Sequence, residues 1–429
     1  GCLQFLRGMF AFAIWDAHRR QLFLARDRLG KKPLCYQQDG EAFRFASEAK
    51  AILQDPAVAA RPDPRAISHY LTYGYVPSPS SAFQGMRKLP PAHYLLCRLP
   101  APLLSGAQAG DGKVEVHRYW RLHRDKKLAR PEAEWCEEIL TRLEEAVRLR
   151  LISDVPLGAF LSGGIDSSAV VAMMSRAAGA AAGMIKTFSV GFDEPDYDEL
   201  AYARLVAKRI GTDHHELVVR PDAVAILPKL AWHFDEPFGD SSAVPTYYVA
   251  QMTRQYVTVA LNGDAGDENF GGYDRYVANV LAASFDRWPG ASLFRRAIRW
   301  GLQCWPRTGG RRSVLSRGRR FLDGLTEVPE RRYARWLCHF YGDQKDELLS
   351  PDFRVGLGGE DALDLLLAAY RESDAPDFVD ATLDVDAGLY LPDDLLVKVD
   401  IASMAHSLEA RSPFLDHEFM EFAATIPSD

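Results

Sequence analysis

A glycine-rich turn that follows a short apolar run is the feature that most constrains the fold of this chain. The segment spans 155–168 and reads VPLGAFLSGGIDSS. The apolar run predicts a β-strand, the Ser-Gly-Gly triplet a tight turn, and the residues after it the start of a helix. Glycines let the backbone approach an anion, and the first turn of a helix offers unpaired N–H groups. The segment therefore predicts a phosphate site at the carboxyl end of a strand.

The side chains of this turn add to the same prediction. Ser162, Ser167 and Ser168 supply hydroxyl donors, and Asp166 supplies a hard oxygen ligand for Mg²⁺. No Gly-Lys-Ser/Thr follows the turn, so it is not a kinase-type P-loop. An ordinary strand–turn–helix connection with serine caps is the alternative, but caps do not call for two glycines, an acid and paired serines together.

From residue 154 onward, strand-like and helix-like segments alternate. We expect strands at 186–192, 215–219 and 256–261, and helices at 167–178, 199–210, 221–234 and 246–255. This alternation predicts a parallel sheet covered on both faces, with ligands beyond the carboxyl ends of its strands.

A second turn follows the predicted strand at 256–261 and reads NGDAGDE over residues 262–268. Asp264, Asp267 and Glu268 place three carboxylates close together, and such acids repel one another unless a cation lies among them. Because both turns follow strands of the same sheet, we expect them to form two walls of one site. A solvated acidic turn that caps the next helix is the alternative.

The first third of the chain has a different pattern. Strand-like segments at 9–16, 21–27, 34–36, 42–46, 93–98 and 114–120 suggest antiparallel hairpins, with a helix at 64–73 and a loop at 100–113. A helix is expected at 130–150. The fold class is therefore α+β followed by α/β, with domains at 1–122 and 123–429.

Composition limits the function only broadly. The net charge of −7 argues weakly against a general nucleic-acid binder, and no apolar run approaches the roughly 18 residues that span a bilayer. The six cysteines are scattered without a Cys-x-x-Cys pair, and no signal-peptide pattern opens the chain, so a cytoplasmic protein is expected. The missing initiator Met and the polar end suggest a fragment.

Several motifs, in order, resemble the glutamine-dependent asparagine synthetases and their amidotransferase relatives. They are the SGGIDS turn at 162–167, TFSVGF at 187–192, DEP at 235–237, GDAGDENFGGY at 263–273, and KVD through SLEARSPFLD at 398–416. RDRLGKKPL at 26–34 and FASEAK at 45–50 resemble the end of the family's glutaminase domain. The resemblance implies the end of an antiparallel N-terminal-nucleophile-type glutaminase domain, followed by a parallel-sheet ATP-pyrophosphatase-type synthetase domain.

The resemblance also implies roles for individual residues. Leu161 and Val190 would contact the adenine nucleotide, and Asn262 and Gly263 would lie near the ribose and α-phosphate. The β- and γ-phosphates would be held by Ser162, Gly163, Gly164, Ser167 and Ser168. Asp166 and Asp267 would hold Mg²⁺, while Asp264 and Lys398 would be catalytic.

The implied reaction consumes ATP. A carboxylate would attack its α-phosphate to give an acyl-adenylate and pyrophosphate, and ammonia would then displace AMP. L-Aspartate would be the carboxylate, glutamine the source of the ammonia, and a homodimer is compatible with the resemblance.

Three departures qualify this expectation. The family's glutaminase nucleophile is an N-terminal Cys followed by Gly, far upstream of the strand that matches 9–16. Here Cys2 is followed by Leu3 and stands almost directly before that strand. The nucleophile and the glutamine pocket are therefore expected outside this chain, which would use ammonia. Ile401 replaces the Arg or Lys of many relatives, which leaves Lys398 as the catalytic cation and weakens a strict assignment to aspartate. The chain also ends soon after Asp416, where relatives continue.

Two alternative functions remain open. One is the same chemistry on a carboxylate of a cell-surface glycan or a secondary metabolite, and the other is a catalytically silent nucleotide-binding protein.

Two further patterns favour structural roles. The run 214–216 (His-His-Glu) lacks a fourth ligand at a sensible spacing and is expected to belong to a strand. A basic tract could touch an anionic glycan, nucleic acid or a membrane, but Trp300, Trp305 and Phe321 predict packed helices with a solvated basic side. Its members are Arg295, Arg296, Arg299, Arg307, Arg311, Arg312, Arg317, Arg319 and Arg320.

Overall fold

The computed structural model describes residues 1–39, 42–98, 113–179, 185–192, 199–219, 223–304, 314–340 and 342–428. The predicted loop at 100–113 lies outside these residues except for its last position. Trp305 and three arginines of the basic tract, Arg307, Arg311 and Arg312, also lie outside them.

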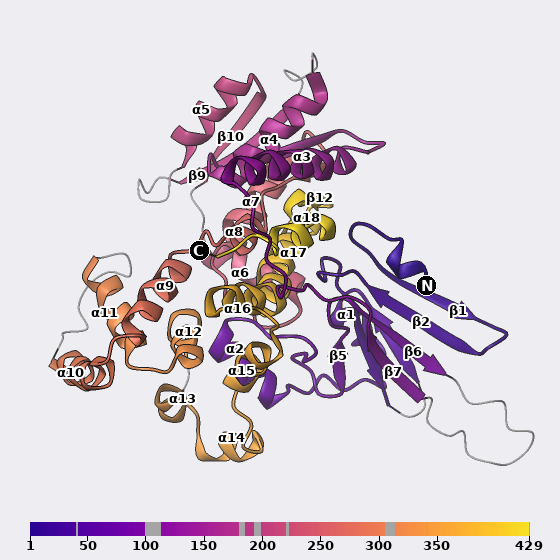
Figure 1. Ribbon diagram of the computed structural model, residues 1–429. Helices are drawn as coiled ribbons and strands as arrows, with labels where there is room; N and C mark the ends of the chain where they lie inside the picture. The colour runs from indigo at the N-terminus through magenta and orange to yellow at the C-terminus, as the bar shows by residue number, and fades with distance from the viewer. Residues whose placement is uncertain are drawn as a thin grey trace, which may run out of the picture.

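Two antiparallel sheets form the N-terminal part (Figure 1). The first has the order β1(Ala11–Asp16), β2(Gln21–Arg26), β6(His93–Arg98), β7(Lys113–Arg118), and the second the order β4(Phe43–Ala46), β3(Cys35–Gln38), β5(Met86–Lys88). Leu24, Leu34, Tyr36, Leu89 and Leu95 are buried in one cluster. The antiparallel prediction is confirmed, while the short β5 was not predicted.

The short turn η1(Cys2–Gln4) precedes these sheets, and α1(Ala49–Ile52) and α2(Pro64–Tyr73) follow β4. Helix α2 begins where the side chain of Asp63 accepts the backbone N–H of Arg65, and it ends at Gly74 in a left-handed conformation. Both signals are standard helix boundaries, so the observed bounds equal the predicted ones.

A five-stranded parallel sheet forms the second part, in the order β10(Asp213–Val219), β9(Lys186–Phe192), β8(Leu157–Phe160), β11(Val259–Leu261), β12(Glu409–Arg411). The parallel prediction is confirmed. Strand β11 is shorter than expected, because the backbone after α7(Ala243–Thr253) turns back onto Thr253 until Val257. Since β8 and β11 are neighbours, the two predicted turns leave adjacent strands at the same edge.

Helices pack around this sheet and extend away from it (Figure 1). Those that precede β11 are α3(Glu132–Arg150), α4(Ile165–Ala178), α5(Leu200–Ile210) and α6(Ala223–Phe234), followed by α7. After it come α8(Gly266–Phe270), α9(Asp274–Asp286), α10(Ala291–Cys304), α11(Val314–Leu325), α12(Pro329–Leu337), α13(Asp343–Leu348), α14(Pro351–Gly356), α15(Leu363–Glu372) and α16(Phe378–Val385).

The last elements are η4(Asp386–Leu395), α17(Leu396–Met404), η5(Pro413–Leu415) and α18(His417–Ala423). The segment η4 is π-helical and runs directly into α17. Among the described residues, no helix is both long and apolar enough to cross a membrane.

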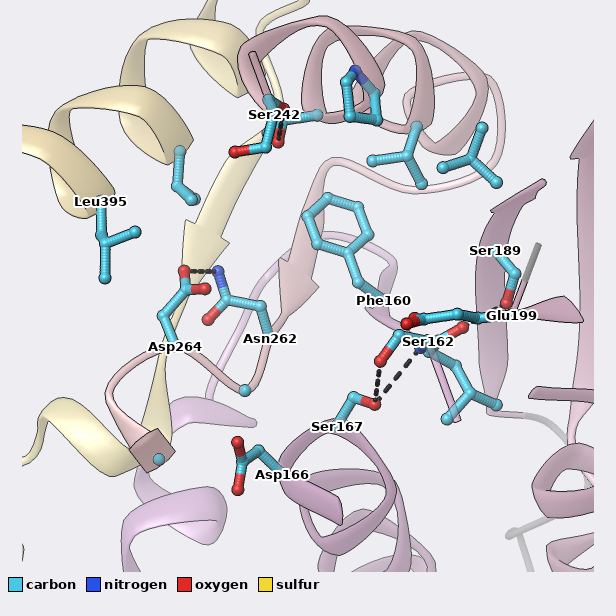
Figure 2. A pocket seen from close by; sticks show the side chains of 18 of the residues that line it. Phe160, Ser162, Asp166, Ser167, Ser189, Glu199, Ser242, Asn262, Asp264 and Leu395 are labelled. Carbon is cyan, nitrogen blue, oxygen red and sulfur yellow. Dashed lines mark hydrogen bonds between the residues drawn. The ribbon is translucent and has the colours of Figure 1, made fainter. Parts of the chain in front are cut away.

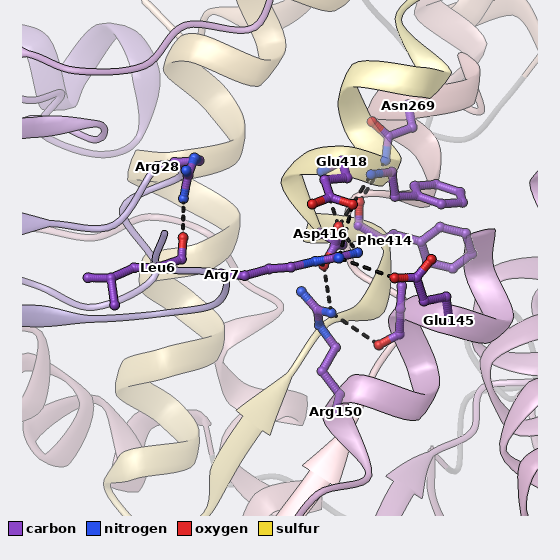
Figure 3. A network of polar contacts seen from close by, with 11 residues as sticks. Leu6, Arg7, Arg28, Glu145, Arg150, Asn269, Phe414, Asp416 and Glu418 are labelled. Atoms are coloured by element: carbon purple, nitrogen blue, oxygen red, sulfur yellow. Dashed lines mark hydrogen bonds and ion pairs between the residues drawn. The ribbon is translucent and has the colours of Figure 1, made fainter. Parts of the chain in front are cut away.

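Ion pairs join the N-terminal part to the rest of the molecule. Lys32 pairs with Asp400 at 2.6 Å, and Lys88 with Glu236. Arg7 reaches the fully buried Asp416, which Arg150 contacts from α3 (Figure 3).

Candidate active site

The two predicted turns line one cavity of about 450 Å³ at the carboxyl ends of β8 and β11 (Figure 2). Of the residues that the sequence singles out, the cavity contains Leu161, Ser162, Asp166, Ser167, Val190, Asn262, Gly263, Asp264, Asp267 and Lys398. Gly163, Gly164 and Ser168 are not among its lining residues. The structure therefore assembles ten of the thirteen candidates, from segments up to 237 residues apart in sequence.

Glycines allow the two turns to approach each other. A Cβ on Gly266 would lie 2.2 Å from Cγ of Asp166, and one on Gly263 would lie 2.8 Å from the amide nitrogen of Ser167. Gly163 has a φ of +83°, and a Cβ there would lie 2.5 Å from the backbone of Tyr202 in α5. Such separations are far below van der Waals contact, so a side chain at Gly263 or Gly163 would displace the backbone of the turns, and one at Gly266 would displace the carboxylate of Asp166.

Serine hydroxyls fix the shape of the first turn. The hydroxyls of Ser162 and Ser167 lie 3.0 Å apart, and the backbone N–H of Ser162 donates to Oγ of Ser167 at 3.2 Å. The N–H of Gly164 in turn donates to Oγ of Ser162 at 3.2 Å. Ser168 Oγ is buried and has no hydrogen-bond partner among the described residues. The turn is thus held in a defined conformation by its own side chains.

The carboxylates of the site are harder to ionise than carboxylates in water. Burial, with the charges of Asp267 and Asp264, raises the pKa of Asp166 to about 6. Burial also raises the pKa of Asp267, which the charge of Arg275 lowers only in part. Because burial shifts both groups toward the neutral form, and neighbouring carboxylates add to the shift of Asp166, a bound cation would stabilise their ionised form.

Asp264 occupies the side of the cavity opposite the paired serines (Figure 2). Burial raises the pKa of its carboxyl, against the charges of Lys398 and Lys31 and a hydrogen bond from Asn262. The side-chain amide of Asn262 donates to Asp264 at 2.7 Å. Lys398 itself donates to Asp240 at 2.7 Å, an ion pair that the sequence did not predict.

Several lining residues were missed by sequence reasoning. Thr246 comes from α7, Ser242 directly precedes that helix, Glu199 stands just before α5, and Leu395 ends η4. Glu268, which the sequence analysis did name among the three acids of the second turn, also lines the cavity, and burial raises its pKa to about 7 although the hydroxyl of Tyr273 donates to its carboxylate. The polar residues before α7 were a usable signal, because polar caps at helix starts often face ligands. Nothing in the sequence around Leu395 indicated that it would line the cavity.

Other candidates lie away from this cavity. Cys2 is exposed. His214 shares a hydrogen bond with Thr187 at 2.9 Å, and the ring of His215 stacks on Phe188 in the sheet. Ile401 lines a second cavity of about 450 Å³, between the N-terminal strands and α6 and α17. Replacing a cation by isoleucine therefore changes that second cavity rather than the lining described above.

The fold and the site together define an α/β protein in which an anion-binding turn and an acidic turn meet at the edge of a parallel sheet. The sequence profile of the family described as "Asparagine synthase" matches residues 138–429, and that described as "Glutamine amidotransferase domain" matches residues 1–120. The chain belongs to the asparagine synthase family.

Curated relatives match almost the whole chain. Asparagine synthetase [glutamine-hydrolyzing] 1 of Bacillus subtilis (strain 168) is 32% identical over 428 residues, which are 99% of this chain and 62% of that protein. Asparagine synthetase [glutamine-hydrolyzing] 3 of the same organism is 29% identical, with the same coverage of both chains. Amidase chry2 of Gibberella zeae is 28% identical over 453 residues, covering 98% of this chain and 63% of that protein. The chain thus spans about 62% of the length of such relatives.

Proposed function

We propose that this chain carries out ATP-dependent amide synthesis: a carboxylate attacks the α-phosphate of ATP and releases pyrophosphate, and ammonia then attacks the acyl-adenylate and displaces AMP. The observation that carries the proposal is the joining of the two turns in one cavity. We assign residues 123–429 to a synthetase domain of the ATP-pyrophosphatase type. Residues 1–122 are assigned to the end of a glutaminase domain of the N-terminal-nucleophile type.

ATP is the substrate that fits the first turn. The N–H groups at the start of α4 and the hydroxyls of Ser162 and Ser167 would bind the β- and γ-phosphates. Leu161 and Val190 would contact the adenine, and Asn262 and Gly263 the ribose and α-phosphate. Asp166 and Asp267 would hold Mg²⁺, whose chemistry is to neutralise phosphate charge. Their raised pKa values fit this role, because two crowded carboxylates favour a cation between them.

Asp264 and Lys398 are the proposed catalytic residues. A carboxyl group with a raised pKa is a better proton acceptor than an ordinary aspartate, so Asp264 can take a proton from the attacking ammonia. Lys398 stabilises negative charge on the α-phosphate while its ion pair with Asp240 holds its ammonium group in place. The other contribution of the site is to orient the two reactants.

L-Aspartate is the proposed acyl substrate, with ammonia derived from glutamine. The names of the Bacillus subtilis relatives support this choice. A second candidate is a carboxylate of a cell-surface glycan or a secondary metabolite, supported by a relative that is named an amidase.

Pyrophosphate release from the full chain tests the proposal. The assay contains ATP, Mg²⁺, ammonium and one carboxylate from a panel. Release that depends on L-aspartate is the expected result, and release with another acid alone would select the second candidate. A folded chain that binds ATP but releases no pyrophosphate with any acid would overturn both candidate reactions. The protein would then be a catalytically silent nucleotide-binding protein.

A matched pair of variants connects this activity to the site. Asp166→Asn removes one proposed metal ligand and should lower release by at least about a hundredfold, a loss of about 2.7 kcal/mol in transition-state stabilisation. Asp154→Asn changes an exposed aspartate before β8 and should leave the rate unchanged. Equal rates for the wild type and Asp166→Asn would contradict the metal assignment.

A further inference from the structure

One helix far from the cavity presents apolar side chains to solvent. Helix α10 lies at the edge of the molecule opposite the N-terminal sheets (Figure 1). Leu293 is 71% exposed and Trp300 is 72% exposed. These two residues and Ala297 are spaced by four and three positions, so they form a stripe along one face of the helix.

The stripe begins at a small aromatic group. Phe294 is half exposed, and its ring centroid lies 5.5 Å from that of Trp288, which is also half exposed. Below, Leu293, Phe294, Trp300 and Trp288 are called the α10 apolar surface. None of these side chains belongs to a buried cluster of the described residues.

The position of Trp300 contradicts the expectation that it packs between helices. Helix α10 packs on α11, and the packing aromatic of this region is Phe321 of α11, which stacks on Trp336 of α12. Trp300 takes no part in this packing and is 72% exposed. An indole with this exposure is unfavourable in water, because its large apolar area remains hydrated.

Positive charge borders the α10 apolar surface. Residues 287–336 contain thirteen arginines against three carboxylates, whereas the whole chain has a net charge of −7. Asp286 pairs with Arg295 and Arg332, and Glu327 with Arg335. Arg296 is exposed, lies beside the stripe, and has no ion-pair partner in the part of the chain that the structure describes. The region therefore carries a local excess of positive charge.

A helix with exposed Leu, Phe and Trp on one face and arginine beside it has the pattern of helices that lie in a membrane interface. Tryptophan is enriched there because its ring is apolar and its N–H can remain hydrated. Nucleic acid would use the arginines but would leave the apolar surface in water. The combination of the two features therefore selects a lipid surface.

We propose that α10 docks this protein reversibly on an anionic membrane surface. Leu293, Phe294 and Trp300 insert between the lipid headgroups, and Arg296 contacts the lipid phosphates. The inference goes beyond the proposed amide synthesis and does not depend on it.

Vesicle co-sedimentation of the full chain tests the docking. The probes are phosphatidylcholine vesicles and phosphatidylcholine vesicles that contain phosphatidylglycerol. We expect binding to the second kind, with a blue shift of the tryptophan emission and weaker binding as salt is raised. Absence of binding to the anionic vesicles would overturn the proposal.

Variants separate the two features of the surface. The double variant Leu293→Ser/Trp300→Ser should lower the partition coefficient at least tenfold. Val355→Ser/Trp15→Ser removes one exposed aliphatic and one exposed indole elsewhere and should bind as the wild type does. Arg296→Gln should reduce the preference for anionic vesicles.

Two controls make the result decisive. Circular dichroism and the rate of pyrophosphate release should be unchanged in all three variants, because the substituted side chains are exposed and distant from the cavity. Duplex DNA is the competing polyanion. Binding to DNA that exceeds binding to vesicles and is unaffected by Leu293→Ser/Trp300→Ser would overturn the proposal in favour of a nucleic-acid surface.

Discussion

Single glycines decide whether the acidic groups of the site can occupy their positions. The Cα of Gly266 faces the carboxylate of Asp166 so closely that no side chain fits between them. The sequence identified Gly263 and Gly266 as turn residues, but it could not indicate that their partner is the aspartate of the other turn. The contact between Gly266 and Asp166 depends on the pairing of β8 with β11, which the sequence alone does not show.

Gly266→Ala should therefore abolish activity with little loss of stability. The added methyl would lie 2.2 Å from Cγ of Asp166 and would force the carboxylate away. We expect pyrophosphate release to fall at least about a hundredfold, since small displacements of catalytic groups have effects of this size.

Gly318→Ala is the matched control for this substitution. No atom lies within 4 Å of the position that its Cβ would take, and Gly318 lies within α11. Activity should be retained and the free energy of unfolding should rise by about 0.5–1 kcal/mol, because alanine favours the helix. A Gly266→Ala enzyme as active as Gly318→Ala would contradict the close approach.

The elements of the fold differ in how well the sequence predicts them. Helix α2 is predictable to the residue because its start and its end both carry local signals. Strand β12 has only three residues, Glu-Ala-Arg, and is a strand only because it pairs with β11. The π-helix η4 is not predicted by periodicity, because the pattern used for helices is the i, i+3, i+4 spacing of an α-helix, whereas the hydrogen bonds of a π-helix run from i to i+5.

The start of η4 carries a buried ion pair that should dominate its stability. Asp386 is fully buried and accepts from Arg275 at 3.0 Å and from the hydroxyls of Tyr276 and Tyr333. The guanidinium of Arg275 lies 4.0 Å from the ring centroid of Tyr273. Asp386→Ala would leave this cation without a counterion.

We expect Asp386→Ala to lower the free energy of unfolding by about 3–5 kcal/mol, as measured by urea denaturation. Glu216→Gln breaks the more exposed pair between Arg204 and Glu216 and should cost less than about 1 kcal/mol. If the two variants lost equal stability, the network at η4 would not have the importance assigned to it.

At the scale of the whole molecule, Asp416 connects three distant segments (Figure 3). Its carboxylate accepts from Arg7 at 2.8 Å, from Arg150 at 2.9 Å, and from the backbone N–H groups that begin α18. Burial alone would raise the pKa of Asp416, but the hydrogen bond and charge of Arg7 and the charge of Arg150 lower it to about 2.

The lowered pKa of Asp416 predicts a pH dependence of stability. An aspartate whose pKa is about 2 in the folded protein and 3.8 in the unfolded chain adds stability that is present well above pH 4 and is lost as pH falls through 2. The loss amounts to about 2 kcal/mol. Urea denaturation of the wild type across this range should show it.

Asp416→Asn should be less stable at pH 7 and should lack this part of the acid sensitivity. Asp154→Asn, at an exposed position, should behave as the wild type does. An unchanged pH profile in Asp416→Asn would show that the connection does not depend on the charge of this residue.

The order of the strands in the parallel sheet has a consequence for folding while the chain is synthesised on the ribosome. Strand β11 is complete at residue 261, but its outer neighbour β12 begins only at residue 409. At roughly 5–20 residues per second, the emerging chain carries an unpaired strand edge beside the glycine turns for about 7–30 s. Open edges of this kind recruit other chains. Slow or interrupted translation between these strands should therefore lower the yield of native protein, although every residue of the finished molecule is unchanged.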